Sequence, residues 1–209
     1  MFTGIVAEVG RVMAINDGSA GRTLRIEAPR TARRLRVGAS VCVDGVCLTA
    51  VRAGRTGFSV QVVPETARRS TLGTMRCHGR VNLERPLPAG GEVGGHFVQG
   101  HVDSRSRVEA LSRAGGEVTL TIRLPASLRG LVVNKGSIAV NGVSLTVAST
   151  TSRSFSVALI PHTLARTNLG DLRSGDRVNL EADILGKYIH ALSGRAATAS
   201  MTRMTRRSR

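Results

Sequence analysis

The sequence predicts an all-β protein made of two tandem small antiparallel barrels, followed by one helix. Three observations predict this class. A β-hairpin signal occurs at residues 40–51 and again at 137–147. The two hairpins belong to a repeat that extends over most of the chain. Each copy of the repeat contains about six short apolar runs separated by turn residues, which is the pattern of a small antiparallel barrel.

The hairpin signal is an apolar run, an Asp-Gly or Asn-Gly pair, and a second apolar run. A two-residue type I′ turn needs positive φ at both central positions. Asp44 and Asn141 tolerate that conformation, and Gly45 and Gly142 adopt it freely. The sequence therefore predicts a tight hairpin at the same place in each barrel.

The strand after each turn places small polar side chains on one face. Cys47 and Thr49 share a face of the first strand, and Ser144 and Thr146 share a face of the second. The residues between them are apolar and are expected to face a core. A short polar pair on an otherwise packed strand is a candidate lining for a pocket.

The repeat extends well beyond the hairpins. Gly45 and Gly142 lie 97 positions apart, and upstream of the hairpin the step is 96. Only two copies of so long a period indicate a duplicated domain and not a solenoid. The matching blocks are GIV at 4–6 with GHV at 100–102, LRIEAP at 24–29 with LTIRLP at 120–125, FSV at 58–60 with 155–157, VPETARRSTLG at 63–73 with IPHTLARTNLG at 160–170, and VNLE at 81–84 with 178–181.

Within each copy the expected elements follow one order. The Pro- and Gly-rich segment 85–95 separates a first domain, 1–94, from a second, 95–183. The short helix after the fifth apolar run is expected to begin near Pro64 or Thr66 and to stop at Gly73. For the first copy we expect strands at 2–15 and 22–28, a helical turn at 30–36, the hairpin at 40–51, a strand near 57–63, the short helix within 64–73, and a strand at 79–84.

The segment 184–194 has no counterpart in the first copy. It carries one apolar stripe, with Asp183 as the expected N-cap and Gly194 as the expected stop. That stripe must be buried either on the chain's own barrel or against a neighbouring subunit. The stripe consists of Ile184, Leu185, Tyr188, Ile189 and Leu192.

Composition limits the function classes. The 209 residues carry a formal charge of +16, but five arginines lie in the tail 195–209, which is expected to be disordered, and the others are scattered without interleaved aromatics. This pattern does not favour nucleic-acid binding. No stretch has the length of a membrane helix and no export signal is present. Three cysteines without metal spacing favour reduced thiols in a cytoplasmic protein without a metal.

Functional candidates emerge as differences between the copies. In the alignment of the two copies, Cys47 corresponds to Ser144. The opening segment 3–5 (Thr-Gly-Ile) corresponds to 99–101 (Gln-Gly-His), and 64–66 (Pro-Glu-Thr) corresponds to 161–163 (Pro-His-Thr). An isolated Cys, Ser or His is more often a strand filler or a surface residue. Here these residues occupy matched positions, which favours two related ligand sites. No Ser-His-Asp order, phosphate loop or zinc spacing is present.

Several motifs in order resemble the riboflavin synthase family, of the α-chain type with two lumazine-binding repeats. They are MFTGIV, GASVCVDGVCLTAV, GGHFVQGHVD, KGSIAVNGVSLTV and IPHTLARTNLG, and the resemblance covers residues 1 to about 192. It implies two six-stranded Greek-key barrels and a helix at 184–194 that joins three subunits. It also implies a pocket between the N-terminal barrel of one subunit and the C-terminal barrel of the next.

The reaction that the resemblance implies is a dismutation, so the enzyme is a transferase. Two molecules of 6,7-dimethyl-8-ribityllumazine exchange a four-carbon unit and give riboflavin and 5-amino-6-(D-ribitylamino)uracil, with no cofactor. Two copies of one substrate fit two related sites. The rival interpretation is a non-catalytic lumazine- or flavin-binding antenna protein of the same fold. Association with a lumazine synthase shell is left open.

The resemblance also implies site residues. Phe2, Cys47, His101, Ser144 and Thr146 match positions associated with the active site, with His101 as the proton-transfer group. Segments 4–6, 47–49 and 61–66 are expected to form one pocket, and 100–102, Lys135, 144–146 and 158–163 the other. Asn141, where many relatives carry Asp, is expected to serve the turn. The expected ligand contacts are Gly4, Ile5, Val6, Cys47, Leu48, Thr49, Gln61, Val62, Val63, Pro64, Glu65, Thr66, Gly100, His101, Val102, Lys135, Ser144, Leu145, Thr146, Ala158, Leu159, Ile160, Pro161, His162 and Thr163.

Overall fold

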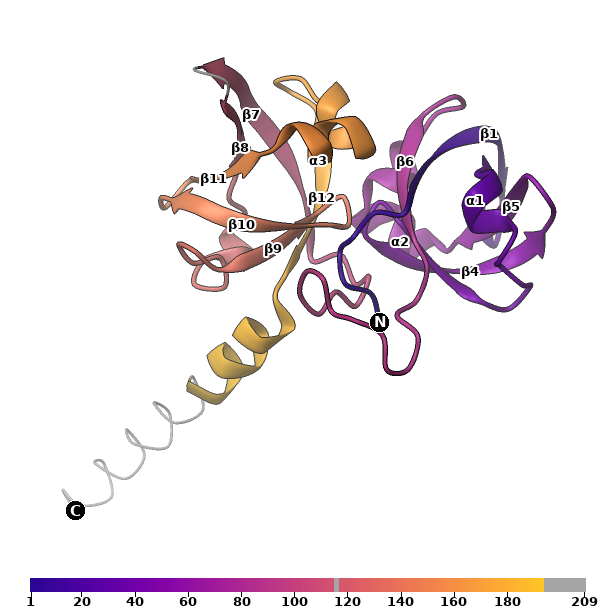
Figure 1. Cartoon of the computed structure of the whole chain (residues 1–209), viewed down its shortest axis with the longest axis horizontal. Coiled ribbons are helices and arrows are strands. Elements are labelled where there is room, and N and C mark those ends of the chain that lie inside the picture. The colour runs from indigo at the N-terminus through magenta and orange to yellow at the C-terminus, as the bar shows by residue number, and fades with distance from the viewer. Residues whose placement is uncertain (115–116, 194–209) are drawn as a thin grey trace, which may run out of the picture.

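Two closed six-stranded barrels lie side by side in the structure, a computed structural model that describes residues 1–114 and 117–193. The first residues of the chain run between the barrels, and a helix extends away from the second one (Figure 1). The predicted fold class is confirmed. Among the described residues, no helix is long and apolar enough to cross a membrane.

The first barrel has the cyclic strand order β1-β2-β5-β4-β3-β6, and β1 pairs with β6 to close it. Because β2 pairs with β5 and not with β3, the connection is of the Greek-key type. Its elements are β1 (Glu8–Gly18), β2 (Gly21–Glu27), α1 (Pro29–Ala32), β3 (Ser40–Val43), β4 (Val46–Ala53), β5 (Gly57–Val62), α2 (Pro64–Arg69), the 3₁₀ helix η1 (Thr71–Thr74) and β6 (Arg80–Glu84).

The second barrel repeats this order as β7-β8-β11-β10-β9-β12. Each strand therefore has a counterpart at the same place in the strand order of the first barrel, which confirms the duplication. Its elements are β7 (Ser104–Ala114), β8 (Glu117–Arg123), η2 (Ala126–Leu128), β9 (Ser137–Val140), β10 (Val143–Thr150), β11 (Ser154–Leu159), α3 (Pro161–Arg166), η3 (Asn168–Asp171) and β12 (Arg177–Ala182).

Both hairpins have the predicted turn. Asp44 and Asn141 each have a φ of 46°, followed by 80° at Gly45 and 74° at Gly142. Val43 pairs with Val46 in the first hairpin, and the matching valines pair in the second. This register leaves two residues in each loop, as a type I′ turn requires.

Each barrel has its own apolar core. Val, Leu and Ile side chains fill both cores, and one aromatic ring lies at the matched position of each, Phe58 in the first and Phe155 in the second. Alternate residues of the strands are buried, as expected for sheets with one face on a core. Each closed barrel thus has a separate core.

Two expected boundaries are wrong. The strand predicted from residue 2 begins at Glu8, because the preceding residues pair with the other barrel. The short helix does not reach Gly73: α2 ends at Arg69 because Ser70 is extended, and a 3₁₀ helix follows. Pro64 occupies its first turn, as a residue without an N–H prefers.

The C-terminal helix covers 184–193 of the described residues. The Asp183 carboxylate accepts a 3.0 Å hydrogen bond from the Leu185 N–H, which confirms the predicted N-cap. One side of the helix faces the second barrel, where Lys187 Nζ lies 2.7 Å from Asp103 Oδ1. The predicted stop at Gly194 and the predicted disordered tail 195–209 lie outside the described residues.

A buried cluster of polar side chains joins the two barrels. We call it the seam cluster, and it consists of Asp44, Asn82, Asn141, Asn168 and Asn179. Two of its bonds are reciprocal: the Asn82 amide donates to the Asn141 carbonyl at 3.0 Å, and the Asn179 amide donates to the Asp44 carbonyl at 2.7 Å. The barrels are therefore docked through a pseudo-twofold arrangement and not through a flexible linker alone.

The seam cluster is not fully symmetric. The Asn168 amide nitrogen donates to Asp44 Oδ1 at 2.9 Å, while its oxygen accepts from Asn82 at 2.9 Å. The matching residue of the first barrel is Thr71, whose buried hydroxyl has no hydrogen-bond partner among the described residues. Burial raises the pKa of Asp44 to about 7, although two donors to its carboxylate act in the opposite direction.

Candidate active site

The strands that follow the two hairpin turns present the predicted polar residues outward. On β4, Cys47 is half-buried and Thr49 is exposed; on β10, Ser144 is half-buried and Thr146 is exposed. The intervening Leu48 and Leu145 face the cores. The alternation predicted from sequence therefore holds at both positions, and each barrel offers one small polar surface.

Each of these surfaces is completed by the opening segment of the other barrel. The Ser144 N–H donates to the Gly4 carbonyl at 2.8 Å, and the Cys47 N–H donates to the Gly100 carbonyl at 2.8 Å. Val6 packs on the core of the second barrel and Val102 on the core of the first. The two opening segments are thus exchanged between the barrels.

This exchange corrects the predicted grouping. The segment 4–6 belongs with Ser144 and not with 47–49, and the segment 100–102 belongs with Cys47 and not with 144–146. The prediction from sequence assigned each opening segment to the pocket of its own repeat. That assumption fails because a strand-like segment pairs with whichever open strand edge the docked barrels place beside it.

Glycine is required where the segments cross. Gly4 and Gly100 have φ values of 78° and 80°. A Cβ on Gly4 would lie 2.7 Å from the Ser144 nitrogen, and a Cβ on Gly100 would lie 2.7 Å from the Cys47 nitrogen. Both positions therefore exclude a side chain, on conformational and on steric grounds.

Two buried glutamates hold the exchanged segments. Glu84, at the end of β6, accepts the Thr3 N–H at 2.7 Å and the Gly4 N–H at 2.9 Å. Glu181, at the matching place on β12, accepts the N–H groups of 99–101 at 2.7–3.0 Å. Burial raises the pKa of both carboxyl groups, and the hydrogen bonds they accept partly oppose that shift.

One functional pair was not predicted. His96 is buried, and its Nδ1 lies 2.7 Å from Ser144 Oγ. The other ring nitrogen has no hydrogen-bond partner in the described part of the chain. Burial lowers the pKa of His96, so the neutral ring is the dominant form at neutral pH. The signal that sequence reasoning passed over was a second histidine in the GGHFVQGH motif, five positions before His101.

The first barrel has no matching pair. Cys47 lies against the Gly100 backbone, and among the described residues its free thiol makes no hydrogen bond to a histidine. His101 is exposed, and its backbone N–H donates to Glu181 at 3.0 Å. The two polar surfaces therefore differ in chemistry: a hydroxyl bonded to an imidazole in one, and a free thiol in the other.

The remaining predicted contacts lie in the segments 61–66 and 158–163 and at Lys135. The segments 61–66 and 158–163 lead from β5 and β11 into α2 and α3. Lys135 is exposed, with a φ of 63°, and its N–H donates to the Val147 carbonyl beside Thr146. The exposed members of the two segments are Gln61, Val63, Pro64, Glu65, Ala158, Ile160, Pro161 and His162; Thr66 and Thr163 are half-buried, and Val62 and Leu159 face the cores.

Phe2 occupies a different environment. Its side chain is fully buried between the barrels with Val98, Cys42 and Ala139, and Cys47 packs at the edge of this group. Phe2 also pairs with Val98 through two backbone hydrogen bonds of 2.7 and 3.0 Å. The structure thus gives Phe2 a packing position behind the polar surface and not a place on it.

The three cysteines are all free thiols. Cys42 faces Cys47 across β3 and β4, but Cys42 is buried and burial raises the pKa of its thiol well above the usual value. Cys77 is exposed and distant in sequence from both polar surfaces. Cys47 is therefore the thiol positioned for a role in the candidate site.

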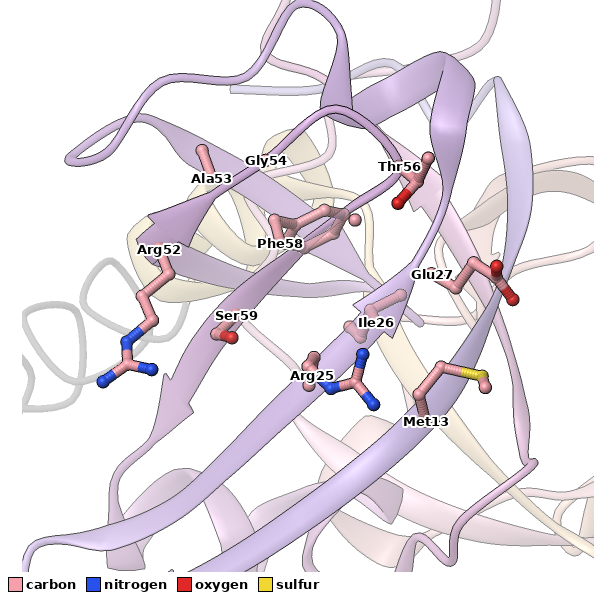
Figure 2. A pocket seen from close by; sticks show the side chains of 11 residues that line it. Met13, Arg25, Ile26, Glu27, Arg52, Ala53, Gly54, Thr56, Phe58 and Ser59 are labelled. Atoms are coloured by element: carbon pink, nitrogen blue, oxygen red, sulfur yellow. The ribbon is translucent and has the colours of Figure 1, made fainter.

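A hollow lies elsewhere on the first barrel. It has a volume of about 330 Å³ and forms at the end of β2 and β5 where Phe58 and Ile26 lie. Figure 2 shows the Arg25 and Arg52 side chains on either side of Ser59 in this hollow. None of the predicted ligand contacts lines it.

Comparison with known proteins agrees with the duplication. The family model of the lumazine binding domain matches residues 3–86 and 99–183. Riboflavin synthase of Mycobacterium tuberculosis (strain ATCC 25618 / H37Rv) is 42% identical over 92% of this chain and 98% of its own. Riboflavin synthase of Actinobacillus pleuropneumoniae is 39% identical over 90% and 88%, and that of Bacillus subtilis is 36% identical over 91% and 88%.

Solved structures share the fold. LumP complexed with 6,7-dimethyl-8-(1'-D-ribityl) lumazine superposes with a TM-score of 0.79 at 22% identity, over 87% of this chain and 99% of that chain. LumP complexed with riboflavin gives a TM-score of 0.81 at 23% identity over the same shares. At this identity the likeness establishes the two-barrel architecture.

Proposed function

The chain belongs to the riboflavin synthase family, and we propose that its two barrels each bind one molecule of 6,7-dimethyl-8-ribityllumazine for the dismutation that this family performs. A four-carbon unit passes from one lumazine to the other, giving riboflavin and 5-amino-6-(D-ribitylamino)uracil. Donor and acceptor are the same compound, so no oxidant or reductant is consumed. The enzyme is a transferase.

The observation that carries this proposal is the pair of related polar surfaces in a chain that matches riboflavin synthases over most of its length. Cys47 and Ser144 occupy the same rank in the two barrels, and each lies beside an exchanged glycine. Two similar surfaces suit two identical ligands. Bringing two molecules together in register supplies a large part of the rate enhancement, because it removes translational and rotational freedom before the reaction.

We assign the proton chemistry of the second barrel to Ser144 and His96. With a neutral imidazole whose Nδ1 accepts, the Ser144 hydroxyl donates across the 2.7 Å contact and becomes more basic at oxygen. This arrangement suits proton removal from the acidic 7-methyl group of the lumazine or addition at C7. Ser144 is the group that touches substrate, and His96 is the positioning residue behind it.

In the first barrel, Cys47 and His101 are assigned to the other lumazine. The thiol offers a polarisable contact or a nucleophile for C7, and the exposed imidazole of His101 is free to move a proton between the two ligands. Thr49 and Thr146 supply hydroxyl groups at the outer edge of each surface. Phe2 acts indirectly, because it fixes the segment that carries Gly4.

The two surfaces of one chain are open, which favours a site shared between subunits. The C-terminal helix leaves its apolar stripe uncovered: Leu185, Tyr188, Ile189 and Leu192 are 56–67% exposed. An apolar stripe of this kind is stable when another helix or subunit covers it. We propose a homotrimer joined there, in which the first barrel of one subunit meets the second barrel of the next. Residence in the cytoplasm stays a prediction from the cysteines and the missing export signal, and association with a lumazine synthase shell stays open.

The direct test is a product assay with purified protein and the lumazine alone. We expect riboflavin absorbance to develop without an added cofactor, with one pyrimidine product formed for each riboflavin. Stable binding without product over long incubation would instead support the antenna function suggested by the likeness to LumP. Cys47→Ser and His101→Ala are expected to lower kcat more than they raise the ligand Kd. Equal losses in both quantities would indicate a structural role.

A second test addresses His96. His96→Ala is expected to lower kcat about 100-fold, the usual range for loss of acid–base assistance. His96→Gln keeps a hydrogen-bonding group near Ser144 and is expected to keep ligand affinity but not the pH dependence of kcat. A pH profile unchanged in His96→Gln would remove the proposed proton role.

A further inference from the structure

Four arginines surround one cavity on the first barrel. The cavity has a volume of about 330 Å³, lies beside α1, and is otherwise lined by Ala7 and Thr31. We call its arginines the α1 cluster; they are Arg30, Arg33, Arg34 and Arg85. None of the lining residues is acidic. The cavity is thus a concentrated positive site, and none of the predicted ligand contacts lines it.

In the part of the chain that the structure describes, none of the four guanidinium groups forms an ion pair. The neighbouring carboxylate of Glu8 is engaged elsewhere, since it accepts the backbone N–H groups of Arg30 at 3.1 Å and Thr31 at 2.7 Å. That carboxylate caps the start of α1 and leaves the arginine side chains without a partner.

The second barrel uses the equivalent place differently. The repeat matches Arg30, Arg34 and Arg85 with Ala126, Gly130 and Ala182, so only Arg129 keeps a charge there. The start of the C-terminal helix lies on that surface, with Lys187 bonded to Asp103 at 2.7 Å. The same location is therefore covered by the chain's own helix in one barrel and is open and basic in the other.

We propose that the α1 cluster binds a small, multiply charged phosphate ligand, such as a diphosphate group. Four like charges around one cavity repel one another, and a ligand of charge −2 or more compensates them together. The guanidinium group presents paired N–H donors in a planar fork that matches phosphate oxygens. The cavity volume is that of a small-molecule site, near the lower end of the usual range.

The test is a calorimetric titration of the full chain with inorganic pyrophosphate at low and moderate salt. We expect saturable binding of one pyrophosphate at this site, with a Kd that rises steeply with salt. The double variant Arg30→Ala/Arg34→Ala is expected to raise the Kd about tenfold or more, since two of the four charges are lost. Both side chains are exposed, so the melting temperature and riboflavin formation should be unchanged.

Arg129→Ala is the matched control, because it removes the one arginine kept at the equivalent place of the second barrel. It should leave pyrophosphate binding at the wild-type value. Three results overturn the proposal: no saturable binding, binding that persists in the double variant, or an equal loss in Arg129→Ala. Binding that persists in the double variant would point to other arginines, including those of the segment 195–209. A phosphate monoester titrated in parallel shows whether one phosphate group suffices or the diphosphate is needed.

Discussion

The two barrels have the same strand order, the same hairpin turns and the same exchanged segments, yet they differ at their polar surfaces. In the first barrel Cys47 lies at the polar surface, whereas in the second Ser144 is bonded to His96. The glutamates that hold the exchanged segments are the same in both copies. The copies share the glutamates and the crossing glycines, whereas the polar residues after the hairpin turns differ, as do two pairs of positions at the seam, Asp44 with Asn141 and Thr71 with Asn168.

This comparison explains why the exchanged segments are constrained so tightly. Gly4 and Gly100 cross the strand of the other barrel at the residue that carries the polar group. A shift in the docking of the barrels would therefore move both polar surfaces at once. The seam cluster and the two glutamates act together to prevent such a shift.

The largest effect is expected from adding a side chain at a crossing point. Gly100→Ala and Gly4→Ala place a Cβ 2.7 Å from a backbone nitrogen at positive φ, and each should lower the free energy of unfolding by about 3 kcal/mol. Urea unfolding measures this loss in the free energy of unfolding. Gly38→Ala is the control: its φ is 85°, but nothing lies within 4 Å of the added Cβ. It should cost about 1 kcal/mol, from the φ angle alone. An equal cost at Gly38 would show that the crossing contact is not tight.

The second prediction tests whether each opening segment is bound to the other barrel. Glu84→Gln replaces one carboxylate oxygen with an NH₂ group that faces N–H donors, and it should cost about 2 kcal/mol. Amide exchange should then increase in 2–5 and at Ser144, which belongs to the second barrel. Glu181→Gln should instead loosen 98–102 and the strand at Cys47. Hydrogen–deuterium exchange with mass spectrometry distinguishes the two patterns, and equal loosening of both segments in each variant would contradict the exchange.

A third prediction concerns Asp44, whose counterpart Asn141 cannot ionise. Because the pKa of Asp44 is raised to about 7 in the folded state, the folded protein holds a proton that the unfolded chain releases at lower pH. Stability from this residue is therefore complete below the unfolded pKa and is lost as the pH rises towards 7. Between pH 5 and 7 the difference in unfolding free energy between wild type and Asp44→Asn should change by about 2 kcal/mol. Urea unfolding at several pH values gives this difference. Parallel curves for the two proteins would show that Asp44 titrates normally.

The smallest effect is expected at Thr71, the counterpart of Asn168. Its buried hydroxyl has no partner among the described residues, so Thr71→Val should raise the unfolding free energy by about 0.5–1 kcal/mol. Thermal unfolding detects a change of this size. A destabilised Thr71→Val variant would mean that the hydroxyl has a partner, such as a bound water.

Local patterns predicted much of the fold. The Asp-Gly and Asn-Gly turns, the alternation at Cys47 and Ser144, and the Asp183 cap depend on residues close in sequence, and the structure has them as expected. The repeat also predicted two equivalent barrels. The boundary at Glu8 was missed because residues 2–5 look like the beginning of β1. Phe2 and Thr3 pair instead with the segment 96–98, and Gly4 bonds to Ser144 of the other barrel.

The candidate site was predicted less completely. The grouping of the opening segments failed, and His96 was passed over, for the same reason: both depend on how the barrels dock. His96 reaches Ser144 across 48 positions of sequence, and its backbone N–H is fixed by the Thr3 carbonyl at 3.1 Å. No local pattern around His96 encodes a contact that exists only after docking.

The central claim is that one first barrel and one second barrel, from different subunits, form each active site. It is tested by mixing two inactive variants, Cys47→Ala and Ser144→Ala, under conditions that exchange subunits, and measuring riboflavin formation. Random mixing should restore about a quarter of the wild-type rate, because one site in four then combines two intact barrels. Each variant alone, treated in the same way, is the control. A mixture that stays as inactive as the separate variants would contradict the account.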